Sequence, residues 1–179
     1  MVSEEPSAPV QIGEDIEAML PVMDSVVRAM KENTSEYAPE DAGFIWSTLY
    51  LAAVNYGEQL QMAEKKDSHA IAARQAMQEI ASACFEDDSD LPDIPDDLLE
   101  AVSYDENRDA YAFGLSDIGD STTKIADVQS DGDAVKVTVE FSSWDEAENY
   151  LFTLVPNPCA DGIAEPVFLY SVRSVERLG

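Results

Sequence analysis

The sequence predicts an α+β fold, with about three N-terminal helices packed on one face of a C-terminal antiparallel sheet of four to six strands. Apolar residues recur at helical spacing in the first half of the chain, and short alternating segments rich in β-branched and aromatic residues fill the second half. Helical segments come first and strand-like segments follow, which favours α+β over alternating α/β. We expect a flexible tether over residues 1–11 and a single domain over 12–179, with a helical part at about 12–101 and a sheet part at about 102–179.

The first helix is predicted in "EDIEAMLPVMDSVVRAMKEN", residues 14–33. Its apolar residues recur at spacings of four and three and therefore share one face: Ile16, Leu20, Met23, Val27 and Met30. Pro21 lies inside this pattern. Because proline lacks an N–H and clashes with the preceding turn, we expect a kink or a break there.

A second helix is predicted over about residues 39–62, beginning near Pro39 with Glu40 and Asp41 at its positive N-terminal end. Over residues 44–54 the apolar side chains cover almost the whole circumference, which is typical of a helix buried on most sides. This helix is therefore expected at the centre of the fold, with three of its residues in the core: Trp46, Leu49 and Ala53.

A third helix is predicted after "KKDS", with Asp67 or Ser68 as its N-cap and Phe85 at its end. Its apolar row is Ala73, Met77, Ile80 and Cys84. The acidic stretch that follows is expected to be a solvated connection. It leads into another helix start in "DIPDDLLEAV", residues 93–102, where proline and acidic residues suit the first turn.

Five segments of the second half predict strands: 110–115, 123–129, 134–141, 149–155 and 166–175. The alternation is clearest in "AVKVTVEF", where one face is apolar and the other polar, as in an antiparallel sheet with one solvated face. The apolar face places three more residues in the core: Val137, Val139 and Phe141. Asp131 and Gly132 predict the hairpin turn before this strand.

The charge of the chain excludes some classes of partner. There are 37 acidic and 10 basic residues, for a net charge of −27, which repels nucleic-acid phosphates and anionic lipids. We therefore expect no nucleic-acid partner, and no apolar run is long enough for a transmembrane segment. The partner is expected to be a protein or a small ligand. The acidity is also compatible with adaptation to high salt.

One acidic turn resembles the start of a calcium-binding loop and makes Asp127, Asp131 and Asp133 candidate metal ligands. The twelfth position of that loop is Thr138, where a calcium loop needs a bidentate glutamate. A second turn, Asp105–Ser116, has the same defect. Because hairpin turns favour Asp and Gly for backbone reasons, a structural role explains both patterns.

No catalytic residue and no cofactor are predicted. The single histidine, His69, lies among polar residues, and the chain contains neither a nucleophile motif nor a glycine-rich phosphate loop. Three aromatic residues of the second helix are candidates for lining a ligand pocket, although residues at helical spacing are more often part of a core: Trp46, Tyr50 and Tyr56.

The two cysteines leave two alternatives open. In an exported protein, Cys84 and Cys159 would form a disulfide that closes a long loop. In a cytoplasmic protein, Cys84 would be a small apolar residue on the core face of the third helix.

Two hypotheses for function follow. The first is a non-enzymatic, acidic interaction or binding module that is exported to the cell envelope or the extracellular medium. It is favoured by the acidity and by residues 1–11, because such tethers often follow an export signal. The alternative is a small-molecule-binding protein or enzyme with a pocket between helix 39–62 and the sheet. The alternative localisation is the cytoplasm.

Overall fold

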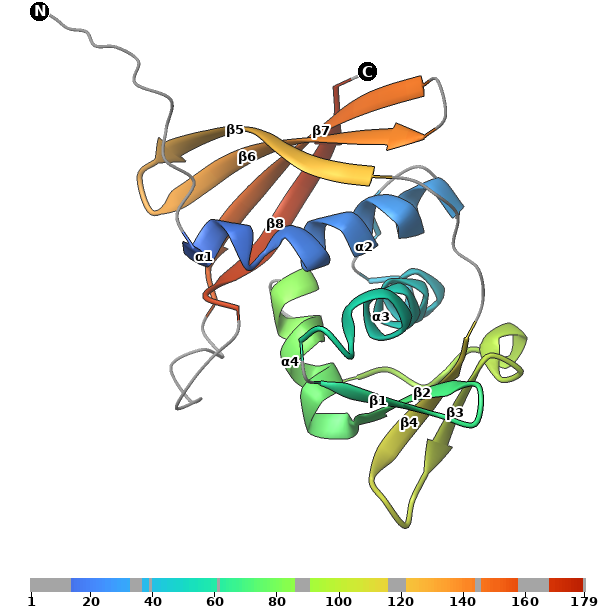
Figure 1. Ribbon diagram of the computed structural model, residues 1–179. Coiled ribbons are helices and arrows are strands. Elements are labelled where there is room, and N and C mark those ends of the chain that lie inside the picture. Colours follow the sequence, from blue (N-terminus) through green and yellow to red (C-terminus); the bar gives the residue numbers. More distant parts are fainter. Residues whose placement is uncertain are drawn as a thin grey trace, which may run out of the picture.

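The computed structural model describes residues 14–32, 37–38, 40–60, 62–85, 91–115, 122–143, 146–157 and 168–178. The α+β prediction is confirmed. The strands divide between two four-stranded antiparallel sheets, and the helices form a layer between them (Figure 1). The predicted tether, residues 1–11, lies outside the described residues. Within the described ranges, no helix is both long and apolar enough to span a membrane.

The first predicted helix is broken as expected. A short helix, α1 (Glu14–Glu17), is separated from α2 (Leu20–Glu32) by a turn. Pro21 is the second residue of α2, where its missing N–H breaks no helical hydrogen bond. Four residues of the predicted apolar row are buried: Ile16, Met23, Val27 and Met30.

Helix α3 (Ala42–Tyr56) is the central helix predicted from its apolar circumference. Its N-cap is Asp41, whose carboxylate accepts a hydrogen bond of 3.1 Å from the Gly43 amide. The expected core residues of this helix are all buried: Trp46, Leu49 and Ala53. The helix ends at Gly57, where a Cβ atom would overlap the side chain of Ala63, so only glycine lets the next strand approach this closely.

Sheet A contains β1 (Ala63–Lys66), β2 (His69–Ala73), β3 (Val102–Asp105) and β4 (Ala110–Gly114), in the order β1-β2-β4-β3. Its inner face packs on α3 and on α4 (Arg74–Cys84). Ala70 and Phe113 are paired on this face and are fully buried.

The start of the third helix was predicted wrongly. Residues 63–73 form a β-hairpin, and α4 begins at Arg74. Asp67 and Ser68 are the two turn residues, with φ of 51° and 66°, as in a type I′ turn. The residues that suggested an N-cap are therefore turn residues, and Ala73 is exposed at the end of β2. The rest of the predicted row is buried: Met77, Ile80 and Cys84.

The helix that was expected to begin within residues 93–102 is much shorter than predicted. Only one 3₁₀ turn, η1 (Asp96–Leu98), forms there, with Pro95 preceding it and strand β3 beginning at Val102. Phe85 follows the last residue of α4, as expected, while residues 86–90 lie outside the described part of the chain.

Sheet B contains β5 (Thr122–Asp131), β6 (Ala134–Ser143), β7 (Glu146–Pro156) and β8 (Tyr170–Arg177), paired in sequence order. Gly132 has a φ of 64° in the two-residue turn between β5 and β6, the position for which the sequence predicted a turn. The predicted alternation is confirmed, because three residues of β6 are buried on one face: Val137, Val139 and Phe141.

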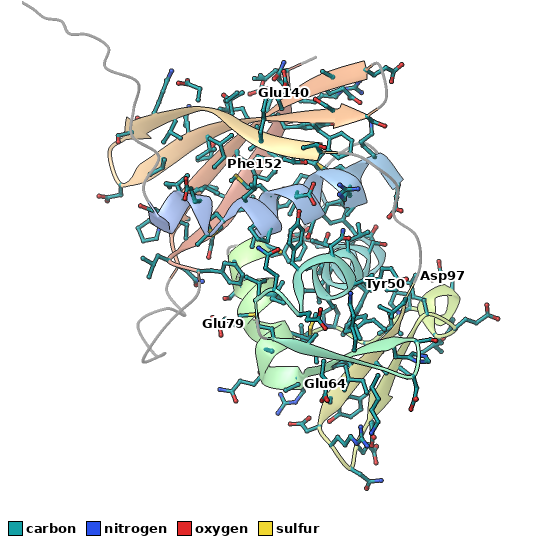
Figure 2. All side chains as sticks on the ribbon, in the orientation of Figure 1. Tyr50, Glu64, Glu79, Asp97, Glu140 and Phe152 are labelled. Carbon is teal, nitrogen blue, oxygen red and sulfur yellow. The ribbon has the colours of Figure 1, made fainter. Side chains whose placement is uncertain are left out.

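The helical layer is shared between the two sheets (Figure 1). Helix α2 packs on α3 and lies against β5 and β6, while α4 contacts both β2 of sheet A and β8 of sheet B. Figure 2 shows the resulting two-sided burial: Phe152 lies between sheet B and the helices, whereas Glu140 lies on the outer side of that sheet. One continuous core therefore supports both sheets.

Candidate functional site

Two of the three candidate pocket residues have structural roles. Trp46 is fully buried, and its indole N–H donates a hydrogen bond of 2.9 Å to the carbonyl of Pro92. The Tyr50 hydroxyl donates to the carbonyl of Gly114. Both groups hold the segment from 91 to 115 against α3, and their hydrogen-bonding capacity is used within the chain.

The third candidate, Tyr56, belongs to a buried polar network centred on Asp24. The carboxylate of Asp24 is 1% exposed and accepts hydrogen bonds from the hydroxyls of Tyr56 and Thr123. The Nε of Arg28 lies 3.0 Å from both of its oxygens. The network thus joins α2, α3 and β5. Asp24 and Arg28 are four residues apart in α2, and this spacing is the sequence signal that could have revealed the network.

The Asp24 carboxylate changes the electrostatics of its neighbour Tyr56. Burial raises the pKa of the Tyr56 hydroxyl, and the hydrogen bond to the Asp24 carboxylate and its charge raise it further. The Arg28 guanidinium also lies over the ring of Phe141, 5.4 Å from its centroid. With its oxygens occupied by donors and its surface buried, Asp24 is placed to connect elements of the fold.

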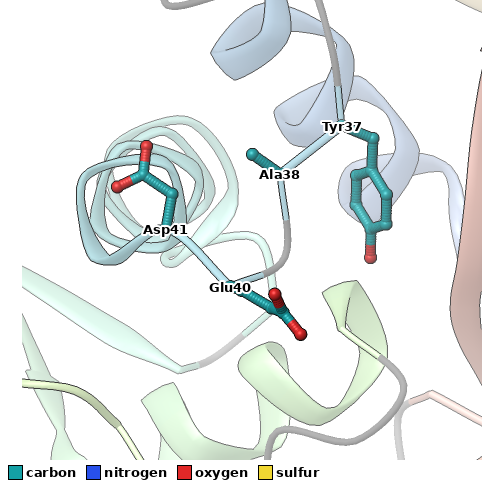
Figure 3. Close-up of a pocket in the computed structure, with 4 residues that line it drawn as sticks. All are labelled: Tyr37, Ala38, Glu40 and Asp41. Carbon is teal, nitrogen blue, oxygen red and sulfur yellow. The ribbon is translucent and has the colours of Figure 1, made fainter.

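A hollow of about 440 Å³ lies beside the start of α3 and is open to solvent (Figure 3). It is lined by Tyr37, Ala38, Glu40 and Asp41, of which Asp41 caps α3. The Tyr37 hydroxyl donates a hydrogen bond of 2.5 Å to the carbonyl of Cys84. The hollow thus lies at the N-terminal end of α3, rather than between this helix and a sheet, and none of the three predicted pocket residues lines it.

The three candidate metal ligands lie in and near the β5–β6 hairpin. Asp127 accepts a hydrogen bond of 3.0 Å from the Gln129 side chain, and Asp131 lies 3.8 Å from the ammonium of Lys136. Asp133 is exposed in the turn. In the part of the chain that the structure describes, no three carboxylate, histidine or cysteine side chains form a group that could hold a metal ion.

The remaining reactive residues are the two cysteines and the single histidine. Cys84 is fully buried, and this burial raises the pKa of its thiol. Cys159 lies outside the described residues, so the disulfide stays a prediction. His69 is exposed on β2, with its Nδ1 atom 2.9 Å from the Asp67 carbonyl oxygen.

The surface around η1 and β3 combines exposed apolar and acidic side chains. Leu99 is 52% exposed and Tyr104 is 42% exposed. Several carboxylates of the same segment are also exposed: Asp93, Asp96, Asp97, Glu100, Asp105, Glu106 and Asp109. Figure 2 shows Asp97 at the periphery of the molecule. The sequence predicted a helix start at residues 93–102, and no pattern in it indicated the exposed leucine and tyrosine of this surface.

Comparison with known proteins gives no family for this chain. No protein-family model matches it, and neither a curated protein nor a solved structure does so. Its function is therefore argued from its own residues.

Proposed function

We propose that the chain is a non-enzymatic binding module that recognises a partner protein through its acidic surface. The supporting observation is that polar groups in the interior are hydrogen-bonded within the chain, whereas carboxylates outnumber cations on the surface. Inside the fold, the polar groups of Asp24, Trp46 and Tyr56 are bonded to the chain itself. On the surface, carboxylates greatly outnumber the cations available to pair with them, because the chain has 37 acidic and 10 basic residues.

The ion pairs between described residues show the size of this excess. Six described carboxylates pair with described cations: Asp24, Asp105, Asp109, Asp131, Glu140 and Glu148. Even if each basic residue paired with a separate acid, 27 carboxylates would remain for solvent or a partner. A surface of this kind attracts a positively charged partner and accelerates its association.

Export to the cell envelope or the extracellular medium is part of this proposal. It is supported by the Pro- and Ser-containing composition of residues 1–11, which is typical of a flexible linker. Fractionation of the source cells, followed by immunodetection of the chain, tests this part. Recovery in the cytoplasmic fraction alone would contradict it.

Binding is tested by selecting peptides from a random display library against the whole chain at low salt. In parallel, a metabolite panel is screened for shifts in melting temperature. We expect the selection to enrich peptides that share a composition. Their binding should be lost at about 1 M salt, where the Debye length is about 3 Å. If no peptide is enriched and a metabolite gives a saturable rise in melting temperature, the chain is instead a small-molecule-binding protein or an enzyme.

A further inference from the structure

Tyr104 differs from the other tyrosines of the chain in its exposure. All seven tyrosines lie within the described residues, and six of them are buried or half-buried, whereas Tyr104 is 42% exposed. It is the third residue of β3, just before the turn of the β3–β4 hairpin. A reagent in solution can therefore reach its ring, and Tyr104 is the most accessible phenol of the protein.

The hydroxyl of Tyr104 donates a hydrogen bond to the carboxylate of Asp109. Asp109 is itself held by Arg74, whose Nε atom lies 2.8 Å from the carboxylate and whose backbone amide donates a hydrogen bond of 2.9 Å to the Asp109 carbonyl. The hydrogen bonds from Arg74 and Tyr104 lower the pKa of Asp109, so its carboxylate is ionised at neutral pH. A base is thus fixed within hydrogen-bond reach of an exposed phenol.

Two other tyrosines donate to carboxylates but are shielded from solution. Tyr56 donates to Asp24, and Tyr150 donates to Glu148. Tyr56 is half-buried, and Tyr150 is 2% exposed. Tyr104 is therefore the tyrosine that combines access from solution with a carboxylate ready to accept its proton.

Two further aromatic rings lie behind Tyr104. Its ring centroid is 5.0 Å from that of Tyr111, which in turn is 4.9 Å from that of Trp46. Trp46 is fully buried, and its N–H donates to the backbone carbonyl of Pro92, which is a poor base. When rings in contact share the loss of one electron, the vacancy comes to rest where a proton can leave. Between Trp46 and Tyr104, that ring is Tyr104.

This arrangement suits one-electron oxidation of the Tyr104 phenol. Loss of an electron makes a phenol a very strong acid, and a base within hydrogen-bond reach accelerates removal of its proton. Asp109 accepts the proton while the ring gives an electron to the oxidant, and a neutral phenoxyl radical remains. Two phenoxyl radicals join through a bond between ring carbons next to their oxygens. Each of these carbons then loses its hydrogen, and each oxygen regains one.

The charge around Tyr104 favours one class of second phenol. Three exposed carboxylates belong to the β3–β4 hairpin: Asp105, Glu106 and Asp109. Two cations pair with them, Arg74 and Arg108, so this region keeps a net negative charge. A cationic phenol is attracted to it, whereas a second copy of the chain, with its charge of −27, is repelled.

We propose that Tyr104 is a site of oxidative coupling, where a one-electron oxidant links the protein to a cationic phenol, such as a phenolic amine, with Asp109 as the proton acceptor. This inference concerns a covalent modification and does not depend on the binding function proposed above.

The site is tested by oxidising the whole chain with photogenerated tris(bipyridine)ruthenium(III) in the presence of tyramine, with a cobalt(III) complex as the final electron acceptor. Mass spectrometry of a digest then identifies the coupled residues. Most of the tyramine should be found on Tyr104, and Tyr104→Phe should lose it. Tyr170→Phe, which removes a half-buried tyrosine of β8, should leave the yield unchanged. Tyramine spread evenly over the tyrosines would contradict the site.

Asp109→Asn tests the proton acceptor, because asparagine suits the positive φ of this position but cannot take the proton. At neutral pH the rate of coupling should fall by about tenfold. The control, Asp105→Asn, removes an equal charge from the residue after Tyr104 and should lower the rate by less than about twofold. At about pH 11, where phenols ionise, the parent and Asp109→Asn should react equally. Equal losses in both variants at neutral pH, or no loss in either, would exclude Asp109 as the acceptor.

The class of phenol is tested with p-hydroxyphenylacetate, which carries a carboxylate in place of the ammonium group of tyramine. At low salt, tyramine should couple to Tyr104 several-fold faster, and the difference should disappear at about 1 M salt, where the Debye length is about 3 Å. Equal rates at low salt would show that charge does not select the phenol. Protein dimers linked through Tyr104 as the main product at physiological salt would identify a second copy of the chain as the partner and overturn the assignment to a cationic phenol.

Discussion

The hydroxyl of Tyr56 donates a hydrogen bond of 2.5 Å to the carboxylate of Asp24, although the two residues are 32 positions apart and Asp24 is 1% exposed. This bond joins the end of α3 to the middle of α2. Replacing Asp24→Asn removes the buried carboxylate charge that pairs with the guanidinium of Arg28. We expect the free energy of unfolding to fall by about 3–5 kcal/mol, measured by urea denaturation.

The control for this substitution is Asp127→Asn, which removes an equal charge from an exposed position of β5 and should change stability by less than about 0.5 kcal/mol. Tyr56→Phe should fall between the two, with a loss of about 1.5–3 kcal/mol for a hydrogen bond to a charged group. Equal stability of the Asp24→Asn and Asp127→Asn variants would show that the network does not support the fold.

Stability should decline at alkaline pH because of buried tyrosines. Burial, together with the charge of Glu148 and the hydrogen bond to it, raises the pKa of Tyr150 to about 12 from an ordinary value of 10.0. Above pH 10 the unfolded chain loses this proton while the folded chain keeps it, so rising pH favours unfolding. The melting temperature should therefore fall between about pH 10 and 12.

The Tyr150→Phe variant identifies this contribution. Because phenylalanine cannot ionise, the melting temperature of the variant should fall less steeply over the same pH range, relative to its own value at neutral pH. Tyrosinate absorbance of the folded parent should show tyrosines that stay protonated above pH 10, since the pKa of Tyr56 is raised as well. Parallel declines for parent and variant would contradict the assignment to Tyr150.

Shortening one side chain on the core face of sheet B should lower the stability of the protein. Val139 is fully buried, paired with Ile125 on one side and Tyr150 on the other. Val139→Ala should lower the free energy of unfolding by about 1–3 kcal/mol through lost apolar burial and a small cavity. Thr138→Ala, on the opposite face of the same strand, should cost less. Overlapping melting curves for parent and Val139→Ala would show that the face assignment is wrong.

Added monovalent salt should raise the melting temperature. A net charge of −27 on a small domain produces self-repulsion, and the Debye length falls from about 8 Å at physiological ionic strength to about 3 Å at 1 M. Calcium should add little beyond an ionic-strength match, because Asp127, Asp131 and Asp133 do not form a metal-binding group. A saturable rise at micromolar calcium would instead indicate a specific site.

Substitutions that suit the backbone conformation of the β1–β2 turn should stabilise the protein. Asp67 and Ser68 both have positive φ, which costs energy for a residue with a Cβ atom. Ser68→Gly should therefore stabilise the protein by about 1 kcal/mol, and adding Asp67→Asn should increase the gain. If residue 68 were a helix N-cap, the same substitution would lower stability, so calorimetry of the single variant distinguishes the two structures.

Hydrophobic periodicity within single segments predicted which faces of a strand or helix are buried. The alternation from Val135 to Phe141 identified the packed face of β6, and the apolar circumference of α3 identified a buried helix. Residues 63–73 were missed because their turn lacks glycine and because the alanines in "HAIAA" favour a helix over a strand. Strand β2 is stabilised by pairing with β4, about 40 residues later in the chain, and no local pattern reveals that pairing.

The candidate sites were missed for the same reason. The bonding of Asp24 depends on Tyr56 and on Thr123, which is 99 residues away, so only the spacing to Arg28 was visible in the sequence. The position of β3 at the edge of sheet A depends on the order of strands in that sheet, which follows from the unpredicted hairpin. The aromatic residues of α3 were predicted as candidates for lining a pocket, whereas the polar atoms of Trp46 and Tyr50 are bonded within the chain.

Because the helical layer is shared by two sheets, synthesis of the chain leaves one side of it uncovered until late. Sheet A is complete once Gly114 has been made, but the sheet that covers α2 is built from the last third of the sequence. On a ribosome, the nascent chain would therefore carry the apolar side of α2 exposed while β5 to β8 are still being added. The emerging chain would depend on chaperones or on rapid translation during that interval, and a truncation before β7 would be prone to aggregate.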